Sequence, residues 1–262
     1  MDCTDTSIPV VRLGNLDFAR LSFNETVRLV LDWACERRKG LIVTPNVDHM
    51  VTMRNDAEMQ AIAGGAILRV ADGMPVVWLS RLVGMPLPER VTGADLLPAL
   101  AAGAGARGVS IFLLGAGPGV AARAAEMLCS HHPDLTIAGT YSPPMGFEHD
   151  LTECQRIVER INAVRPALLF VGLGAPKQEK WAARWLAQLD VGPVLGVGAA
   201  FDFLAGEVRR APVPLQRVGL EWLWRLMMEP RRMWHRYLVN GPRFLAVIVD
   251  EIALRRRIGK PR

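Results

Sequence analysis

Short apolar runs alternate with helical stretches from Gly40 to Val197. The runs are nearly continuous, which is typical of strands buried on both faces of a sheet. They lie at 40–44, 66–71, 109–114, 135–139, 167–172 and 194–197. Helical stretches are predicted at 47–63, from Pro75 onward, and at 96–102, 120–129, 151–164 and 176–188. This alternation predicts an α/β fold, a Rossmann-like parallel sheet with helices on both faces.

The strand–helix pattern begins anew near residue 105 and stops after Gly206. We therefore expect an α/β body at residues 1–206, in two lobes at about 1–105 and 106–206. Helical periodicity continues to the end of the chain, at 215–228, 230–238 and 242–256. Residues 207–262 are thus predicted to form a helical appendage.

Composition fits a folded protein. Half of the 262 residues are apolar and 22% are charged, which suffices for a sizeable core and excludes global disorder. No apolar run approaches the ~20 residues that a membrane-spanning helix needs, so we expect none. The acidic, polar start at 1–5 lacks the features of a standard secretory signal. The four cysteines are far apart, which argues against a disulfide framework or a zinc ribbon.

Positive charge is concentrated at the C-terminal end. Residues 207–262 hold 13 Lys and Arg against 5 Asp and Glu, a net charge of +8, whereas residues 1–206 hold 18 against 21, a net −3. The basic segment also contains the aromatic residues Trp222, Trp224, Trp234, Tyr237 and Phe244. This combination suits a nucleic-acid surface or an anionic membrane. A helical cap with a solvated basic face fits as well.

Ligands of open parallel sheets bind where the strands end at their carboxyl edge. Three polar residues follow the first two predicted strands: Thr44, Asn46 and Asp72. The carboxylate of Asp72 can act as general base on a substrate hydroxyl, and Asp72-Gly73 also suits an ordinary Asx turn. Asn46 can equally be a helix N-cap, and Thr44 a plain strand end.

Gly115, Gly117 and Gly119 lie between a strand and a helix. Such a turn suits phosphate, because glycine lets the backbone approach and a helix N-terminus favours an anion. A tight strand–helix turn explains the same glycines. A dinucleotide enzyme would also place an acid at the end of the next strand, where 138–141 holds none. This argues against a nicotinamide cofactor.

Two charged residues stand at later strand ends. Lys177 lies in the first turn of a helix, where a cation is unfavourable without an anion nearby, so a bound phosphate would explain it. Asp202 interrupts an apolar run and can accept hydrogen bonds from a nucleotide or cap a helix. No D-x-D is present, the five histidines fit no ligand spacing, and no G-x-S-x-G occurs. We therefore expect no metal, no cofactor and no serine hydrolase.

Ordered sequence blocks cover roughly residues 8–250. They are Thr44–Asp48 (TPNVD), Ala71–Val77 (ADGMPVV), Glu89–Asp95 (ERVTGAD), Leu113–Gly115 with Pro118-Gly119, Val171–Glu179 (VGLGAPKQE), Gly198–Phe203 (GAAFDF), Arg210–Pro212, Gly219–Leu226 (GLEWLWRL), Glu229–Arg232 and Arg236-Tyr237. This series resembles the WecG/TagA/CpsF glycosyltransferases, glycosyltransferase family 26.

The resemblance implies an inverting transfer of a sugar from a UDP-sugar onto a sugar carried by a polyprenyl diphosphate, in the synthesis of a cell-surface or wall polysaccharide. It implies Asp72 as the base. The matching active-site positions are Thr44, Asn46, Arg90 and Gln178, and the uridine contacts are Asp202 and Tyr141. With the glycine turn and the helix-start lysine, the expected UDP-sugar site comprises Gly115, Gly117, Tyr141, Lys177 and Asp202.

In this family the C-terminal segment associates with the membrane, and its arginines approach the acceptor diphosphate. The matching positions are Arg225, Arg231, Arg232 and Arg236. The resemblance thus implies an anionic membrane surface as a partner, without nucleic acid, and a peripheral place on the inner face of the cell membrane. Its members are typically metal-independent. The apolar side of the segment suits a subunit contact too, so a homo-oligomer stays open.

From the resemblance, we expect N-acetylmannosamine as the donor sugar and N-acetylglucosaminyl-diphospho-undecaprenol as the acceptor. A glucosyl or N-acetylmannosaminuronosyl donor in exopolysaccharide assembly is the alternative. A nucleotide-binding oxidoreductase and a nucleic-acid-binding protein are more distant alternatives.

Overall fold

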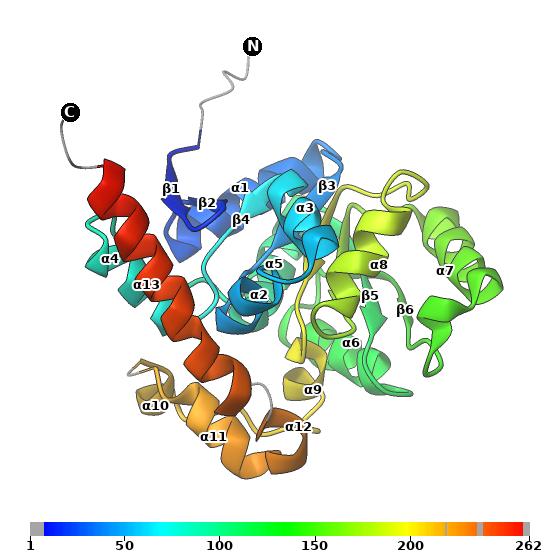
Figure 1. The fold of residues 1–262 in the computed structure, drawn as a ribbon. Helices are drawn as coiled ribbons and strands as arrows, with labels where there is room; N and C mark the ends of the chain where they lie inside the picture. The colour runs from blue at the N-terminus through cyan, green and yellow to red at the C-terminus, as the bar shows by residue number, and fades with distance from the viewer. Residues whose placement is uncertain (1–7, 218, 235–237, 259–262) are drawn as a thin grey trace.

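A parallel sheet forms the centre of the molecule. The computed structural model describes residues 8–217, 219–234 and 238–258, and within them six strands pair in the order β4-β3-β8-β7-β5-β6 (Figure 1). The strands are β3 (Gly40–Val43), β4 (Leu68–Arg69), β5 (Ser110–Gly115), β6 (Thr136–Tyr141), β7 (Leu168–Gly172) and β8 (Pro193–Gly196). The predicted α/β class with a parallel sheet is confirmed.

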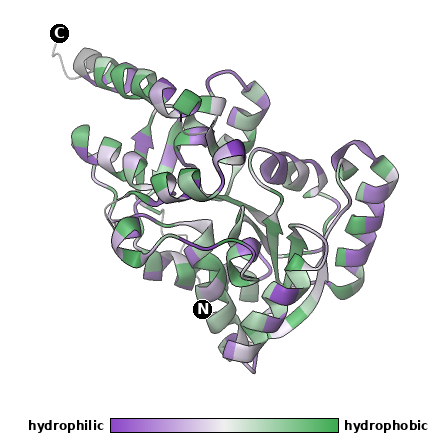
Figure 2. Cartoon of the chain, turned by 90° about the horizontal axis from the view of Figure 1, so that it is seen from below, coloured by the Kyte–Doolittle hydropathy of each residue, from purple (hydrophilic) through white to green (hydrophobic). Residues whose placement is uncertain are grey.

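Helices cover both faces of this sheet. One face carries α1 (Phe23–Cys35), α5 (Gly93–Arg107), α6 (Val120–His131) and α9 (Ala200–Leu204). The other carries α7 (Leu151–Val164) and α8 (Lys177–Trp185). Neighbouring strand residues alternate between the two cores, as Leu169 and Phe170 do. Because both faces are covered, the central strands are apolar throughout and appear green in Figure 2.

A two-stranded antiparallel hairpin, β1 (Val10–Leu13) and β2 (Leu16–Ala19), was not predicted. It packs in a third apolar cluster with α2 (Val47–Thr52), α4 (Met74–Leu82) and α13 (Asn240–Ile258). Glu251 of α13 is buried, and its Oε2 accepts a hydrogen bond from the backbone N–H of Gly14 at 2.6 Å. The two ends of the described chain therefore lie side by side (Figure 1).

Two helices predicted as single elements are each broken, so these predictions are wrong. The stretch 47–63 forms α2 and α3 (Ala57–Gly65), because the carboxylate of Asp56 caps a new helix by accepting a hydrogen bond from Met59 N–H at 2.9 Å. The stretch 215–228 forms α10 (Val213–Arg217) and α11 (Glu221–Met228). Gly219 lies between them with φ of +74°, a conformation that continues neither helix.

Other boundaries follow their local signals. The side chain of Asp150 caps α7, which spans the predicted 151–164. The predicted strand 66–71 is reduced to the two residues of β4. The remaining elements are a short 3₁₀ helix η1 (Phe147–His149) and α12 (Pro230–Trp234). Because β8 pairs with both β3 and β7, the sheet joins strands from the two predicted lobes, whose boundary stays a prediction.

The C-terminal helices α10 to α13 lie along one side of the α/β body (Figure 1). The described C-terminal part of the chain, up to Ile258, is thus mainly helical, as predicted. No helix within the described ranges is long and apolar enough to cross a membrane.

Candidate active site

A cavity of about 820 Å³ opens at the carboxyl edge of the sheet, between the body and the C-terminal helices. Its volume lies in the range of roughly 300–1,000 Å³ that is usual for small-molecule sites. Loops after β3, β4, β7 and β8 form one wall, and residues of α11 to α13 form the other. Six predicted site residues line it: Thr44, Asn46, Asp72, Arg90, Gln178 and Arg225.

The loops that carry Asn46 and Asp72 are neighbours. The backbone N–H of Asp72 donates to the carbonyl oxygen of Pro45 at 3.0 Å, which fixes the loop after β4 on the loop after β3. Gly73 then adopts φ of +115°, which a residue with a side chain rarely does, and α4 follows. Thr44 is buried at the end of β3. The fold thus brings a carboxylate, an amide and a hydroxyl to one cavity wall.

A buried polar chain supports this wall. His49 Nδ1 lies 3.0 Å from Asn46 Oδ1, and His49 Nε2 lies 3.2 Å from Glu179 Oε1. Gln178 Nε2 donates to the same carboxylate oxygen at 2.7 Å, and Gln178 Oε1 accepts from Gly198 N–H at 3.0 Å. Gln178, only 4% exposed, therefore holds the loops after β7 and β8 together.

From the sequence, Glu179 was a candidate only as a polar residue after a predicted strand, beside Lys177 and Gln178, and His49 was given no role. Burial alone would raise the pKa of Glu179, but the charge of His49 and the hydrogen bonds from His49 and Gln178 outweigh it and hold that pKa below its ordinary value. The available signal was local: Glu179 follows Gln178 in the first turn of α8, and His49 stands three residues after the N-cap Asn46.

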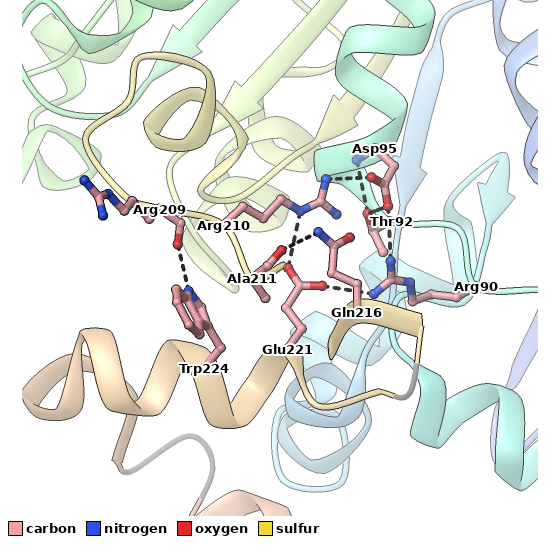
Figure 3. Close-up of polar contacts among 9 residues, drawn as sticks. All are labelled: Arg90, Thr92, Asp95, Arg209, Arg210, Ala211, Gln216, Glu221 and Trp224. Atoms are coloured by element: carbon pink, nitrogen blue, oxygen red, sulfur yellow. Dashed lines mark hydrogen bonds and ion pairs between the residues drawn. The ribbon is translucent and has the colours of Figure 1, made fainter. Parts of the chain in front are cut away.

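Arg90 belongs to a ring of four charged residues that joins the two walls (Figure 3). It pairs with Asp95 at 3.4 Å and with Glu221 of α11 at 2.9 Å. Arg210 pairs with the same two carboxylates, at 2.6 and 3.4 Å. Burial alone would raise the pKa of Asp95, but the two arginines and Thr92 hold it below its ordinary value. Arg90 thus connects the body to α11 and lines the cavity as well.

The glycine turn lies away from the described lining of the cavity. A Cβ atom at Gly115, whose φ is +127°, would lie 2.5 Å from the carbonyl oxygen of Gly172. Glycine is therefore required here by the close approach of β5 to β7. A Cβ atom at Gly117 would meet Val120 at 3.6 Å, an ordinary contact. The phosphate-binding role of both glycines stays a prediction.

The other predicted UDP contacts also have partners within the chain. The hydroxyl of Tyr141 donates to Glu153 Oε1 at 2.5 Å, and this bond, with burial, raises the pKa of Tyr141. Lys177 Nζ pairs with Glu148 Oε1 at 2.6 Å, so this carboxylate supplies the anion that the helix-start lysine lacked in the sequence pattern. Asp202 is half-buried in the first turn of α9. Their roles toward UDP stay predictions.

The predicted acceptor arginines occupy different places. Arg225 lines the cavity, its guanidinium lies 5.6 Å from the ring centroid of Phe203, and its Nε is buried without a hydrogen-bond partner among the described residues. Arg231 is exposed on α12. The side chain of Arg232 and the whole of Arg236 lie outside the described residues. Of the predicted acceptor arginines whose side chains the structure describes, Arg225 lines the same cavity as Asp72.

Comparison with known proteins decides the family. The family model described as "Glycosyl transferase WecG/TagA/CpsF family" matches residues 11–258. The chain belongs to this family. A relative from Bacillus spizizenii, N-acetylglucosaminyldiphosphoundecaprenol N-acetyl-beta-D-mannosaminyltransferase, is 31% identical over 238 residues, which cover 90% of each chain. The protein is therefore a glycosyltransferase, and the alternatives of an oxidoreductase and a nucleic-acid-binding protein gain no support.

In the part of the chain that the structure describes, no three His, Cys, Asp or Glu side chains are grouped so that they could hold a metal ion. The metal-independent reaction that the WecG/TagA/CpsF family resemblance implies stays a prediction.

Proposed function

We propose that this protein moves N-acetylmannosamine, with inversion, from UDP onto N-acetylglucosaminyl-diphospho-undecaprenol during synthesis of a cell-surface or wall polymer. The name of the B. spizizenii relative supports the sugar and the acceptor. One observation carries the proposal: Asp72 from the body and Arg225 from α11 line the same cavity. A donor held on the sheet side and a lipid diphosphate held on the helix side would meet there.

The chemistry follows from these side chains. The acceptor hydroxyl attacks the anomeric carbon from the face opposite UDP, and the Asp72 carboxylate takes the hydroxyl proton. The new carbon–oxygen bond forms as the bond between the anomeric carbon and the β-phosphate oxygen breaks. UDP departs with that electron pair. Positive charge at the cavity wall, from Arg90 and Arg225, stabilises the phosphates of the departing UDP and of the lipid acceptor.

The C-terminal helices support a peripheral contact with an anionic membrane, on its cytoplasmic face. Large apolar side chains are exposed on them: Trp222, Leu223, Met227, Met228, Trp234, Leu238, Leu245 and Val249. Figure 2 shows apolar positions along the helix that ends at the C-terminus. Apolar side chains enter the membrane interface while basic ones meet anionic headgroups, so a segment of net charge +8 suits this contact.

UDP release by the purified protein tests the transferase. A short-chain prenyl-diphosphate acceptor bearing N-acetylglucosamine would be offered with UDP-linked N-acetylmannosamine, its uronic acid, glucose or galactose. We expect release with the first donor, only with acceptor present, and unchanged by EDTA. Release with another donor would keep the reaction class and change the sugar. Absence of UDP binding in calorimetry would contradict the proposal.

Cosedimentation with anionic vesicles tests the membrane contact. Met227→Glu places a negative charge on the exposed face of α11 and should weaken binding about fivefold, since a charge near such a surface changes the free energy by ~1 kcal/mol. Leu151→Glu is the matched control, because the Leu151 side chain is exposed at the start of α7, and this variant should bind as the wild type does. Unchanged binding of Met227→Glu would contradict the contact. If Met227→Glu instead dissociates an oligomer of the protein in the absence of vesicles, the exposed face of α11 is a subunit interface.

A further inference from the structure

The Asn46 side chain is oriented by the start of α2. Its Oδ1 accepts hydrogen bonds from the backbone N–H groups of Asp48 at 3.0 Å and His49 at 3.2 Å. Because these two donors fix the amide oxygen toward the helix, the NH₂ group points the other way. Asn46 lines the cavity, so the NH₂ group is the part of this side chain left for a ligand.

His49 holds Asn46 from a second side. Its Nδ1 lies 3.0 Å from Asn46 Oδ1, which only accepts, so this hydrogen bond requires a hydrogen on Nδ1, and the Asn46 backbone nitrogen at 3.4 Å is then a neighbour and not a partner. The other ring nitrogen, Nε2, lies 3.2 Å from Glu179 Oε1. A carboxylate only accepts hydrogen bonds, so Nε2 carries a hydrogen, and Glu179 fixes the plane of the ring. The imidazole therefore connects α8 to the N-cap of α2.

A glutamate at position 179 is unfavourable for the stability of the fold. It is 2% exposed, and its Oε2 is buried without a hydrogen-bond partner among the described residues. A buried carboxylate with an unpaired oxygen costs free energy, and a well-packed apolar residue is often at least as stabilising. Its presence directly behind the cavity wall therefore points to a role beyond packing.

We propose that Glu179 and His49 are positioning residues for the transfer reaction, which they serve by holding the NH₂ group of Asn46 toward an oxygen of the donor sugar. The inference rests on the proposed transferase function. Asp72 is coupled to the same loop, because its backbone N–H donates to Pro45 at 3.0 Å. A shift of Asn46 is therefore transmitted to the loop that carries Asp72. Misplacement by about 1 Å can cost on the order of 100-fold in rate.

Two substitutions of His49 separate its two contacts. Glutamine places its amide nitrogen near the position of Nε2 and keeps the bond to Glu179, whereas asparagine places it near Nδ1 and keeps the bond to Asn46. In the full-length protein, we expect His49→Gln to lower kcat by roughly 10- to 100-fold, with the Kd for UDP unchanged. His49→Asn should retain more of kcat than His49→Gln. His149→Asn, at an exposed histidine, is the control and should match the wild type.

Glu179 is tested in the same way. Glu179→Gln keeps an oxygen that can accept from Nε2 and should retain most of kcat, whereas Glu179→Ala should lose as much as His49→Gln. All rates are expressed per UDP-binding site counted by calorimetry, so that misfolded chains do not enter. A role in folding alone would reduce the number of sites and leave kcat per site unchanged.

Unchanged kcat per site in His49→Gln and Glu179→Ala would overturn the inference, and equal rates for His49→Asn and His49→Gln would overturn its route through Asn46. These results presuppose an active wild type. A wild type that releases UDP with no donor of the panel would instead refute the transferase proposal, and this inference with it. The two failures are therefore distinguishable.

Discussion

The two walls of the cavity are built differently. On the body side, Thr44, His49 and Gln178 are buried, and hydrogen bonds tie His49 to the start of α2 and Gln178 to the loop after β8. On the helix side, α11 (Glu221–Met228) buries none of its residues, and Trp222 is 39% exposed. The body wall is thus part of the core, whereas the helix wall combines an exposed α11 with the buried Met233 of α12 and Phe244 of α13.

Polar contacts join these walls. They include the charged ring around Arg90 and a hydrogen bond from Asn240 to Asp48 at 2.7 Å. Fixed dipoles and charges accelerate a reaction because they need not reorganise, so the buried wall suits the chemical step. On the helix side, α13 packs in the apolar core, whereas α11 buries no residue and is held by partly exposed contacts, so α11 opens at lower free-energy cost and suits a lipid-borne acceptor. Substitutions in the two walls should therefore change different kinetic constants.

The largest effect is expected on the body side, at Asp72. Asp72→Asn keeps the size of the side chain but removes the base, and should lower kcat at least ~100-fold, the usual scale for general-base catalysis. Steady-state UDP release measures kcat, and calorimetry should give an unchanged Kd for UDP. A fully active variant would refute the base assignment.

A smaller effect is expected across the cavity, at Arg225. Arg225→Ala removes one charged donor to the acceptor diphosphate, a contact of about 1.5–3 kcal/mol, so the KM for the lipid acceptor should rise roughly tenfold or more. The Kd for UDP should stay the same. Arg243→Ala, at an exposed position of α13, controls for general loss of positive charge. If instead the Kd for UDP rises and the acceptor KM does not, Arg225 belongs to the donor side.

The body was predictable because its signals are local. Continuous apolar runs identify strands covered on both faces, and the cap at Asp150 gives the start of α7. The break at Asp56 was missed because a helical period spans it, although the residue is a good N-cap. The β1–β2 hairpin was missed because its apolar side is covered by α13, more than 200 residues later in the chain.

The sequence predicted where the site lies but not how its side chains are held. Ligands of open parallel sheets bind at the carboxyl ends of the strands, so Thr44, Asn46 and Gln178 could be grouped before the structure, and all three line the cavity. Their partners could not, because the link between His49 and Glu179 depends on how α2 and α8 pack. The same holds for Lys177, whose anionic partner Glu148 lies far from it in the sequence.

The junction between the walls should respond more weakly than either wall. Glu221→Gln leaves Arg90 and Arg210 with fewer negative partners, and we expect a loss of about 1 kcal/mol in the free energy of unfolding, because the ring is partly exposed. The same variant should have a higher KM for the lipid acceptor and an unchanged kcat at saturating acceptor. Urea unfolding and acceptor titration measure the two. A fall in kcat at saturating acceptor would show that the ring also shapes the chemical wall.

The smallest expected effect is a difference in how pH and salt change the stability that two carboxylates contribute, Asp95 at the junction and Glu179 in the body. The pKa values of Asp95 and Glu179 are lowered in the folded protein, below 3.8 and 4.5 respectively, so each carboxylate adds stability above that pH and loses it as the pH falls through the folded pKa. Asp95 is partly exposed, with a side chain 31% accessible, whereas that of Glu179 is 2% accessible.

Salt screens exposed charges, with a Debye length of about 8 Å at physiological ionic strength and 3 Å at 1 M, and it screens buried pairs much less. The difference in Tm between the wild type and Asp95→Asn should therefore be positive near pH 6, shrink below pH 3.8, and shrink also in 1 M NaCl at pH 6. The difference for Glu179→Gln should disappear in acid but persist in salt. Equal salt sensitivity of the two variants would show that the walls are joined by an interface as closed as the core itself.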